Sequence, residues 1–247
     1  MTAPVFVVDR LDPAPGDRRY VLDGPEGRHA VSVKRLRAGE DVVLTDGAGR
    51  WAEGEVEAAE GKDRLVVRLG DVEEEPEESP RLTVVQALPK GDRGELAVET
   101  MTEVGVDAVV PWAASRCITQ WRGERGLKAL GKWRATAREA GKQSRRVRFP
   151  EVADAATSKQ VASLLAEADF AAVLHESGTE ALATAELPAS GDIVLVVGPE
   201  GGVSPEELEL FARAGAKPYR LGRSVLRTST AGTAAAALLL GRTGRWS

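Results

Sequence analysis

The chain has 247 residues and a formal net charge of −5, with 43% hydrophobic and 29% charged residues. This composition is typical of a globular protein with a sizeable core, and no apolar run approaches the roughly 20 residues that cross a bilayer. The N-terminus lacks the basic start and apolar core of a signal peptide. A single cysteine, Cys117, excludes an intrachain disulfide. We therefore expect a cytoplasmic location, where thiols stay reduced. We also expect no metal site, because no Cys and His residues cluster at metal-ligand spacing.

The positive charge is concentrated in one segment. Residues 116–148 contain eleven Lys or Arg and two acidic residues, a net charge of +9, so the rest of the chain carries −14. Such asymmetry favours a local anionic partner on an otherwise acidic protein. A solvated helix face is the alternative interpretation, and the charge pattern alone does not decide between the two.

The first seventy residues have the pattern of a small β domain. Residues 4–8, 40–47, 50–60 and 63–70 predict strands, and a short helical piece is expected within 27–39. We therefore expect an all-β barrel over residues 1–72. The acidic segment 70–81 follows, with two prolines and almost no apolar residues, which is typical of an exposed linker.

After this segment, expected strands and helices alternate to the end of the chain. Strands are predicted at 81–88, 107–112, 147–152, 169–176, 192–197 and 217–222, with helices at 92–105, 126–142, 158–168, from Pro205, and at 230–241. This alternation indicates a parallel sheet with helices on both faces. In the long basic helix, one buried stripe is expected, made by residues at three- and four-residue steps: Leu127, Leu130, Trp133, Ala137 and Ala140.

The stretch "VVGPEGGVSPEEL" joins an apolar strand to a helix through a glycine-rich turn. Ligands bind where the strands of open α/β sheets end, and Gly201 and Gly202 let a ligand approach the main chain closely. Ser204 and Glu207 have the spacing of a capping box, so an ordinary strand-to-helix turn is the alternative interpretation. No lysine follows the glycines, and the three glutamates of this stretch would repel a phosphate. A neutral or cationic ligand fits better, and S-adenosylmethionine is one.

Two other strand ends are expected to contribute to such a site. The stretch "VLHESG" places Leu174, His175 and Glu176 at the end of one strand. The stretch "RLGRSVLRTSTAG" runs from another strand into an alanine-rich helix, and its small side chains suit chain segments that pass close to one another.

Five motifs, in order along the chain, closely resemble those of SPOUT-class RNA methyltransferases. "VVGPEGGVSPEEL" and "LGRSVLRTSTA" resemble the family's cofactor loops, and "RHAVSVKRLRAGEDVVLTDGAG" resembles its N-terminal PUA-like barrel. "VETMTEVGVDAVVPWAASRC" and "WRATAREAGKQSRR" resemble its remaining signatures. The match is to the RsmE type, which methylates N3 of a uridine in 16S ribosomal RNA. The resemblance covers nearly the whole chain and implies a PUA-like barrel at 1–72 and a trefoil-knotted α/β methyltransferase domain at 80–247.

The resemblance also implies partners and site residues. It implies a homodimer that uses S-adenosylmethionine, needs no metal and acts on 16S ribosomal RNA, within the small ribosomal subunit. The cofactor would touch Leu174, His175, Glu176, Gly198, Pro199, Glu200, Gly201, Gly202, Leu221, Gly222, Ser224, Val225, Leu226 and Thr230. RNA would be bound by Arg10, Lys34, Arg35, Arg37, Arg138, Gln143, Arg145 and Arg146. As catalytic residues we hypothesise Arg227 or Arg116, stabilising the negative charge that develops as the uracil imide loses its proton.

Two positions depart from the family pattern. Ser229 stands where the family usually has glutamate, and Arg145 stands where it has glycine. A carboxylate role therefore cannot be assigned to position 229. Trp121 and Trp133 are expected to serve core or interface packing rather than base stacking. Alternatives are a SPOUT enzyme that methylates a ribose 2′-hydroxyl or transfer RNA, an RNA-binding assembly factor without catalysis, and a nicotinamide-dependent oxidoreductase.

Overall fold

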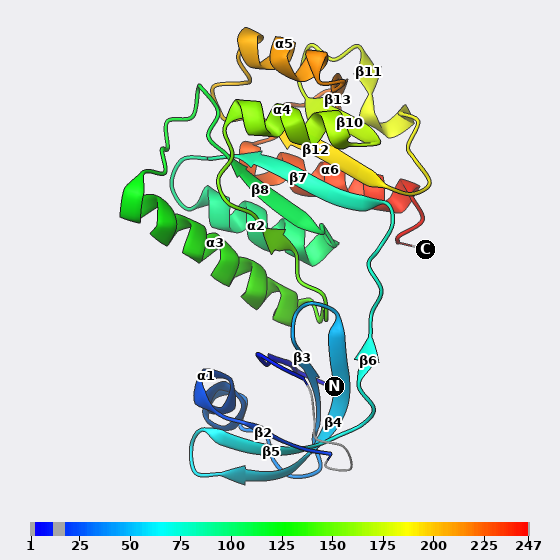
Figure 1. Cartoon of the computed structure of the whole chain (residues 1–247). Coiled ribbons are helices and arrows are strands. Elements are labelled where there is room, and N and C mark those ends of the chain that lie inside the picture. The colour runs from blue at the N-terminus through cyan, green and yellow to red at the C-terminus, as the bar shows by residue number, and fades with distance from the viewer. Residues whose placement is uncertain (1–2, 12–17, 247) are drawn as a thin grey trace. The chain divides into compact units, whose positions relative to one another are not determined.

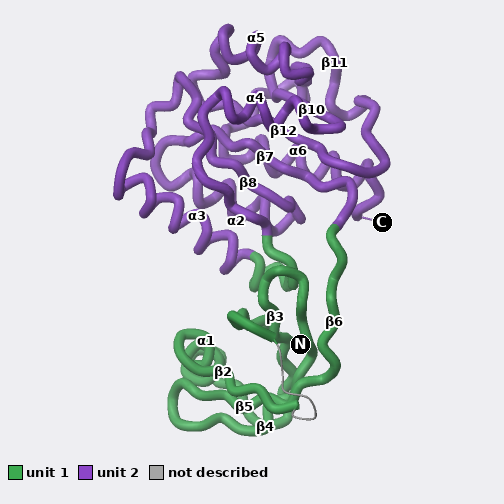
Figure 2. The backbone as a smooth tube through the Cα atoms, in the orientation of Figure 1, with its two compact units in different colours: residues 1–77, 141–149 green, residues 78–140, 150–247 purple. Residues whose placement is uncertain are grey.

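The computed structural model describes residues 3–11 and 18–246, which divide into two compact units (Figure 2). Unit 1 comprises residues 1–77 and 141–149, and unit 2 comprises residues 78–140 and 150–247. Each unit has its own hydrophobic core. Among the described residues, no helix combines the length and the apolar character that crossing a membrane requires.

Unit 1 is built on one β-sheet with the strand order β1-β3-β4-β5-β2, and β6 pairs with β4. The short helix α1 continues into a π-helical turn at His29–Val33. The four strands and the helical piece expected from the sequence are confirmed, whereas β2 and β6 were not foreseen. The elements are β1 (Val5–Val7), β2 (Arg19–Leu22), α1 (Gly24–Arg28), β3 (Asp41–Thr45), β4 (Arg50–Glu60), β5 (Arg64–Leu69) and β6 (Glu73–Glu74).

The acidic segment after β5 is not the free linker that its composition suggests. Its residues Glu73–Glu74 pair with the first residues of β4, and the Glu75 N–H donates to the Gly49 carbonyl at 2.8 Å. The guanidinium of Arg148 donates to the carbonyl of Glu75 at 2.7 Å. Most of its side chains are exposed, as expected, but the main chain of Glu73–Glu75 is bound to unit 1. Composition reports side-chain polarity and carries no information on such main-chain pairing.

Unit 2 contains a seven-stranded sheet with the order β11-β13-β10-β12-β7-β8-β9. Every pairing in it is parallel, which confirms the expected parallel sheet. The central strands β7 and β12 are buried on both faces; β12 reads as a continuous apolar run for that reason, whereas β7 also buries Thr83 and Gln86. The strands are β7 (Arg81–Ala87), β8 (Ala108–Trp112), β9 (Glu151–Val152), β10 (Phe170–Leu174), β11 (Glu180–Ala181), β12 (Asp192–Val197) and β13 (Lys217–Arg220).

Helices cover both faces of this sheet. Figure 1 shows α4 and α5 on one face, with α2 and α6 on the other. The start of α6 packs very closely, since a Cβ on Gly232 would lie 2.8 Å from the Met101 sulfur and 3.5 Å from a Val197 methyl. The small residues of this segment therefore serve close packing, as expected. The helices are α2 (Arg93–Val104), α3 (Gly123–Gln143), α4 (Ser158–Glu167), α5 (Pro205–Arg213) and α6 (Thr228–Arg242).

The buried stripe of α3 differs from the expected one at its first position. Leu127 is 70% exposed, so its predicted burial is wrong. Gly126 is buried in its place, because Trp121 folds against the first turn and a Cβ on Gly126 would lie 2.9 Å from the Trp121 carbonyl carbon. The rest of the stripe, from Leu130 to Ala140, is buried as predicted.

Candidate functional site

Three loops predicted to bind the cofactor follow neighbouring strands of unit 2. The order β13-β10-β12 places the ends of these three parallel strands at one edge of the sheet. The His175 N–H donates to the Tyr219 carbonyl at 3.0 Å, joining the end of β10 to β13. A Cβ on Gly178 would lie 2.8 Å from the carbonyl carbon of Tyr219, so the two segments pass in close contact. The structure thus brings together loops that are separated along the chain.

The glycine-rich turn after β12 packs against the segment that carries Arg116. Gly202 has a φ of +73°, which favours glycine, and its N–H donates to the Pro199 carbonyl at 2.9 Å. A Cβ on Gly201 would lie 3.2 Å from the Cβ of Arg116. The Arg116 guanidinium donates to the Gly201 carbonyl at 3.2 Å. Arg116, predicted as a catalytic candidate, therefore contacts the predicted cofactor loop directly.

Glu207 has a structural role that the sequence showed only in part. The expected capping box with Ser204 is present at the start of α5. The same carboxylate also accepts hydrogen bonds from the Ser115 N–H at 2.8 Å, the Ser115 hydroxyl at 3.0 Å and the Ser158 hydroxyl at 2.8 Å. Burial by itself raises the pKa of the Glu207 carboxyl, but these hydrogen bonds outweigh it and hold the pKa below its ordinary value.

From the sequence, the three glutamates of this stretch were expected to repel a phosphate. The contacts of Glu207 and Glu200 give these two carboxylates a structural role instead. Glu207 is 5% exposed and faces the two serines, and Glu200 accepts a hydrogen bond from the Lys90 N–H at 3.2 Å. Glu207 therefore fixes the segment next to Arg116 rather than selecting a ligand. The sequence carried no signal for this contact, because Ser115 lies 92 residues before Glu207.

The loop after β13 ends at Arg227, which is exposed and serves as the N-cap of α6. Its carbonyl accepts hydrogen bonds from the Thr230 and Ala231 amides, both at 2.9 Å. Val225 is 85% exposed and Leu226 is 40% exposed. Ser229, at the position of the family's glutamate, is only 3% exposed and faces the core of unit 2. The exposed side of this first helical turn therefore presents Arg227 and Thr230.

The remaining candidates around these loops have simple environments. The Nδ1 atom of His175 accepts from the Ser177 N–H at 3.2 Å and lies 2.7 Å from the Ser177 hydroxyl, so the ring is held within its own loop. Burial raises the pKa of the Cys117 thiol, which keeps it protonated at neutral pH. Within the described residues, no group of three or more His, Cys, Asp or Glu could hold a metal ion.

The predicted RNA contacts are distributed over both units. On unit 1, Arg10, Lys34, Arg35, Arg37, Gln143 and Arg145 are exposed, and Arg146 is half-buried; on unit 2, Arg138 is half-buried. Arg145 also lines a cavity of about 780 Å³ in unit 1, together with Arg18, Trp51 and Arg68. Arg18 precedes β2, Trp51 lies on β4 and Arg68 lies on β5, so no local sequence motif groups these three residues.

Arg145 occupies a backbone conformation that favours glycine. It has a φ of +61° at the end of α3, where the Arg146 N–H donates to the Gly141 carbonyl and the Arg145 N–H to that of Lys142. This pair of bonds is the Schellman ending of a helix, in which glycine usually takes the left-handed position. The family's glycine at this position thus has a physical reason.

Replacing Arg145 by glycine should stabilise the protein and weaken RNA binding. Relief of the left-handed strain is worth roughly 1–2 kcal/mol, and the greater entropy that glycine loses on folding offsets about 0.5–1 kcal/mol of it; urea unfolding measures the net gain. The loss of a guanidinium should raise the Kd for RNA. Arg145→Ala is the matched control, because it removes the charge but keeps the strain. Equal stability of the glycine and alanine variants would contradict the prediction.

Comparison with known proteins identifies relatives over the whole chain. Residues 76–240 match the family model of an RNA methyltransferase domain, and residues 22–70 match that of an RNA methyltransferase PUA domain. The chain is 44% identical, over its full length and 94% of the relative, to the ribosomal RNA small subunit methyltransferase E of Mycobacterium bovis. A protein of that name from Bacillus subtilis is 27% identical, covering 86% of each chain.

Solved structures agree with these sequence relationships. The ribosomal RNA small subunit methyltransferase E of Neisseria gonorrhoeae, bound to S-adenosyl methionine, is 28% identical with a TM-score of 0.84, covering 98% of each chain. A methyltransferase of Legionella pneumophila, in complex with the same cofactor, has a TM-score of 0.85 at 27% identity and the same coverage. Together the matches confirm the resemblance inferred from the motifs and the expected fold class, a SPOUT domain with a PUA-like N-terminal barrel.

Proposed function

Because this chain belongs to the family of RNA methyltransferases that carry a PUA domain, we propose that it transfers the methyl group of S-adenosylmethionine to N3 of a uridine in 16S ribosomal RNA. The observation that carries the proposal is the convergence of three loops, including the glycine-rich turn, at the ends of β13, β10 and β12. In this proposal residues 1–72 bind RNA together with Arg138, Gln143, Arg145 and Arg146, and residues 80–247 hold the cofactor and catalyse the transfer.

The residues of the three loops fit an adenosyl ligand. A Cβ on Gly222 would meet no atom within 4 Å, so the main chain is open there. Among the described residues, Arg116 alone donates a side-chain hydrogen bond to the glycine-rich turn, and that bond goes to a protein carbonyl. A nucleoside can bind open main-chain groups of this kind. We assign cofactor binding to the fourteen loop residues from Leu174 to Thr230 that the motifs indicate.

When bound, the cofactor supplies a methyl group on a positively charged sulfur. The protein must position the uracil and stabilise the negative charge that its oxygens gain as the N3 proton leaves. We assign this stabilisation to Arg227, whose exposed side chain stands at the N-terminus of α6, where the helix dipole also favours negative charge. Arg116 is the alternative donor. Neither arginine can accept the N3 proton, because a guanidinium is a cation without a free lone pair, so in this proposal the proton passes to solvent.

The proposal extends to the assembly and its location. Exposed apolar side chains occur on the loop before α6, at Val225 and Leu226, and on α2, at Leu96. They support a homodimer, which analytical ultracentrifugation of the purified chain would detect as twice the chain mass. We further propose that the RNA is methylated within the small ribosomal subunit, in the cytoplasm.

Primer extension on ribosomal RNA tests the function most directly. A methyl group on uridine N3 blocks base pairing and stops reverse transcriptase. We expect one stop in 16S ribosomal RNA to vanish in a strain that lacks the gene and to return when the gene is restored. An unchanged pattern would contradict the assignment to uridine N3. Calorimetric titration with S-adenosylmethionine then separates the alternatives, because an assembly factor without catalysis should release no heat of binding.

A further inference from the structure

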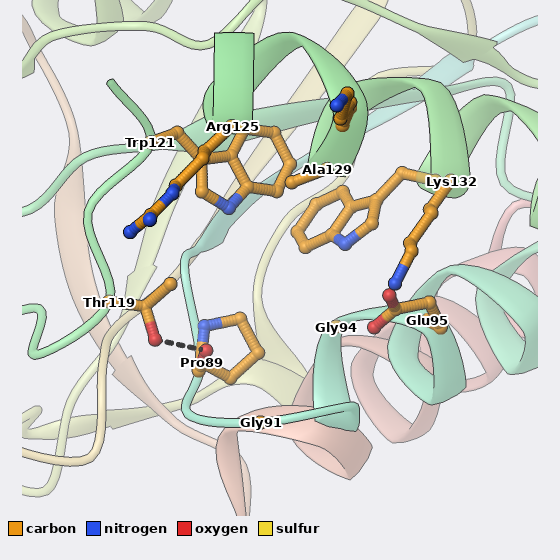
Figure 3. Close-up of a pocket in the computed structure, with 11 residues that line it drawn as sticks. Pro89, Gly91, Gly94, Glu95, Thr119, Trp121, Arg125, Ala129 and Lys132 are labelled. Atoms are coloured by element: carbon orange, nitrogen blue, oxygen red, sulfur yellow. Dashed lines mark hydrogen bonds between the residues drawn. The ribbon is translucent and has the colours of Figure 1, made fainter. Parts of the chain in front are cut away.

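Unit 2 contains a cavity that the proposed function does not use (Figure 3). Its volume is about 420 Å³, and it is formed by the loop between β7 and α2, the start of α2, residues 119–121 and the first half of α3. The volume is in the range of small-molecule sites. None of the residues assigned to the cofactor or to catalysis lines it.

One part of the lining is aromatic. The rings of Trp121 and Trp133 meet edge to face, with centroids 5.0 Å apart and an angle of 79° between their planes. Trp121 is half-buried, and Trp133 is 2% exposed. The indole N–H groups of Trp112 and Trp246 donate to protein oxygens. No described residue accepts a hydrogen bond from the N–H of Trp133. This donor is therefore left for a ligand or water in the cavity.

The other part of the lining is cationic. Arg125, Lys128 and Lys132 line the cavity at spacings that place them on one face of α3. All three are exposed, and none takes part in an ion pair with a described carboxylate. Their neighbour Arg134, by contrast, is paired with Asp154 at 3.0 Å. Glu95 is the one acidic residue of the lining, so the cavity carries a net positive charge.

The walls of the cavity are held in place by the protein itself. The Thr119 hydroxyl donates to the Pro89 carbonyl at 2.8 Å, as Figure 3 shows. A Cβ on Gly94 would lie 2.5 Å from the Trp133 ring, so α2 begins in close contact with that indole. A preformed site of this kind loses little entropy when it binds a ligand.

We propose that this cavity binds an unpaired nucleotide of RNA, in addition to the uridine that is methylated. The half-buried indole of Trp121, held edge to face by the buried Trp133, offers a stacking surface for the base, and the three cations lie on the helix face that would hold its phosphate. An acidic peptide would match the cations but would leave the aromatic surface unused. The proposal rests on the proposed function for the kind of nucleic acid that is bound. It gives a role in RNA binding to Trp121, which was expected only to pack.

The double variant Lys128→Gln/Lys132→Gln tests the phosphate contacts. With a fluorescent single-stranded oligouridylate as the probe, we expect binding about tenfold weaker than for the wild type. The slope of log K against log salt should also fall by about 0.7 for each phosphate that the variant no longer neutralises. Lys159→Gln/Lys217→Gln is the matched control, because it removes the same charge from exposed positions on α4 and β13. Equal affinity of the two double variants would overturn the proposal.

The variant Trp121→Leu tests the stacking of the base. Affinity for oligouridylate should fall roughly 5- to 150-fold with an unchanged salt slope, and part of the quenching of tryptophan fluorescence by RNA should disappear. Polyglutamate and inorganic phosphate serve as competitors, and displacement of the RNA by polyglutamate at equal charge would assign the cavity to acidic peptides instead. If thermal unfolding shows that Trp121→Leu does not fold, the lysine pair decides.

Failure of this proposal is distinguishable from failure of the proposed function. Calorimetry with S-adenosylmethionine and methylation of small subunits are run on the same wild-type preparation. If the wild type methylates RNA and both cavity variants bind RNA normally, only the proposal that the cavity binds a nucleotide is refuted. If the wild type binds RNA through the cavity but neither binds S-adenosylmethionine nor methylates RNA, only the proposed methyltransferase function is refuted.

Discussion

Replacement of Arg227 by alanine should lower kcat by about 10²- to 10³-fold while the Kd for S-adenosylmethionine stays nearly the same. The reason is that the guanidinium is proposed to act on charge that appears only as the uracil loses its proton, so the substrate and the cofactor in their ground states gain little from it. Single-turnover methylation of small ribosomal subunits would give the rate, and calorimetry would give the cofactor affinity.

Two further variants make this result interpretable. Arg213→Ala removes an exposed arginine from α5 that pairs with Glu209, and its rate should match the wild type. Arg116→Ala should show which of the two candidate arginines contributes more to the rate. If Arg227→Ala weakens cofactor binding as much as it slows turnover, Arg227 serves binding and the proposed charge stabilisation is refuted.

Replacement of Glu207 by alanine should lower the free energy of unfolding by about 3 kcal/mol. The variant leaves the partly buried donors of Ser115 and Ser158 and the buried N–H of Ser204 without their acceptor, and each such loss costs roughly 1–3 kcal/mol when the donor is buried. The rate should fall as well, because Ser115 immediately precedes Arg116. Glu209→Gln, on the exposed side of the same helix, is the control and should change stability by less than about 1 kcal/mol.

The contribution of Glu207 to stability should depend on pH in a defined direction. Because its pKa in the folded protein lies below the ordinary value of 4.5, the folded state favours the charged carboxylate. The contribution is complete above about pH 5 and is lost as the pH falls through the folded-state pKa. Unfolding of Glu207→Gln should therefore vary less with pH in this range than that of the wild type. Parallel curves for the two proteins would contradict this account.

Local patterns predicted most of the elements, because each depends on nearby residues. The capping box at Ser204 and the end of α2 at Gly105 follow from the chemistry of a few adjacent positions. The insertion of β13 between β10 and β11 could not be derived in this way, since strand order depends on tertiary packing. The exposure of Leu127 was missed for a similar reason, because Trp121 covers the first turn of α3 from outside the helix.

The sequence predicted which loops form the candidate site, but it did not predict the side-chain contacts between them. Glycines and strand ends indicated which segments would meet, and the sheet order brings them to one edge. The partners of Glu207 lie 92 and 49 residues away in the chain, and no pattern in a single sequence links them. Likewise, the cavity beside Trp121 and Trp133 combines four separate segments, each of which looks like ordinary packing when read alone.

The assignment of residues 141–149 to unit 1 limits how the protein can be dissected. The Thr45 hydroxyl donates to the Val147 carbonyl at 2.7 Å, and the Phe149 N–H donates to the Gly47 carbonyl at 2.8 Å. A fragment that stops at residue 77 would lack the hydrogen-bond partners that residues 147 and 149 provide. It would also expose the surface around Gly47 that the Phe149 ring covers. The polypeptide passes between the units three times. Neither unit is therefore one contiguous segment that could be moved into another protein as a single gene fragment.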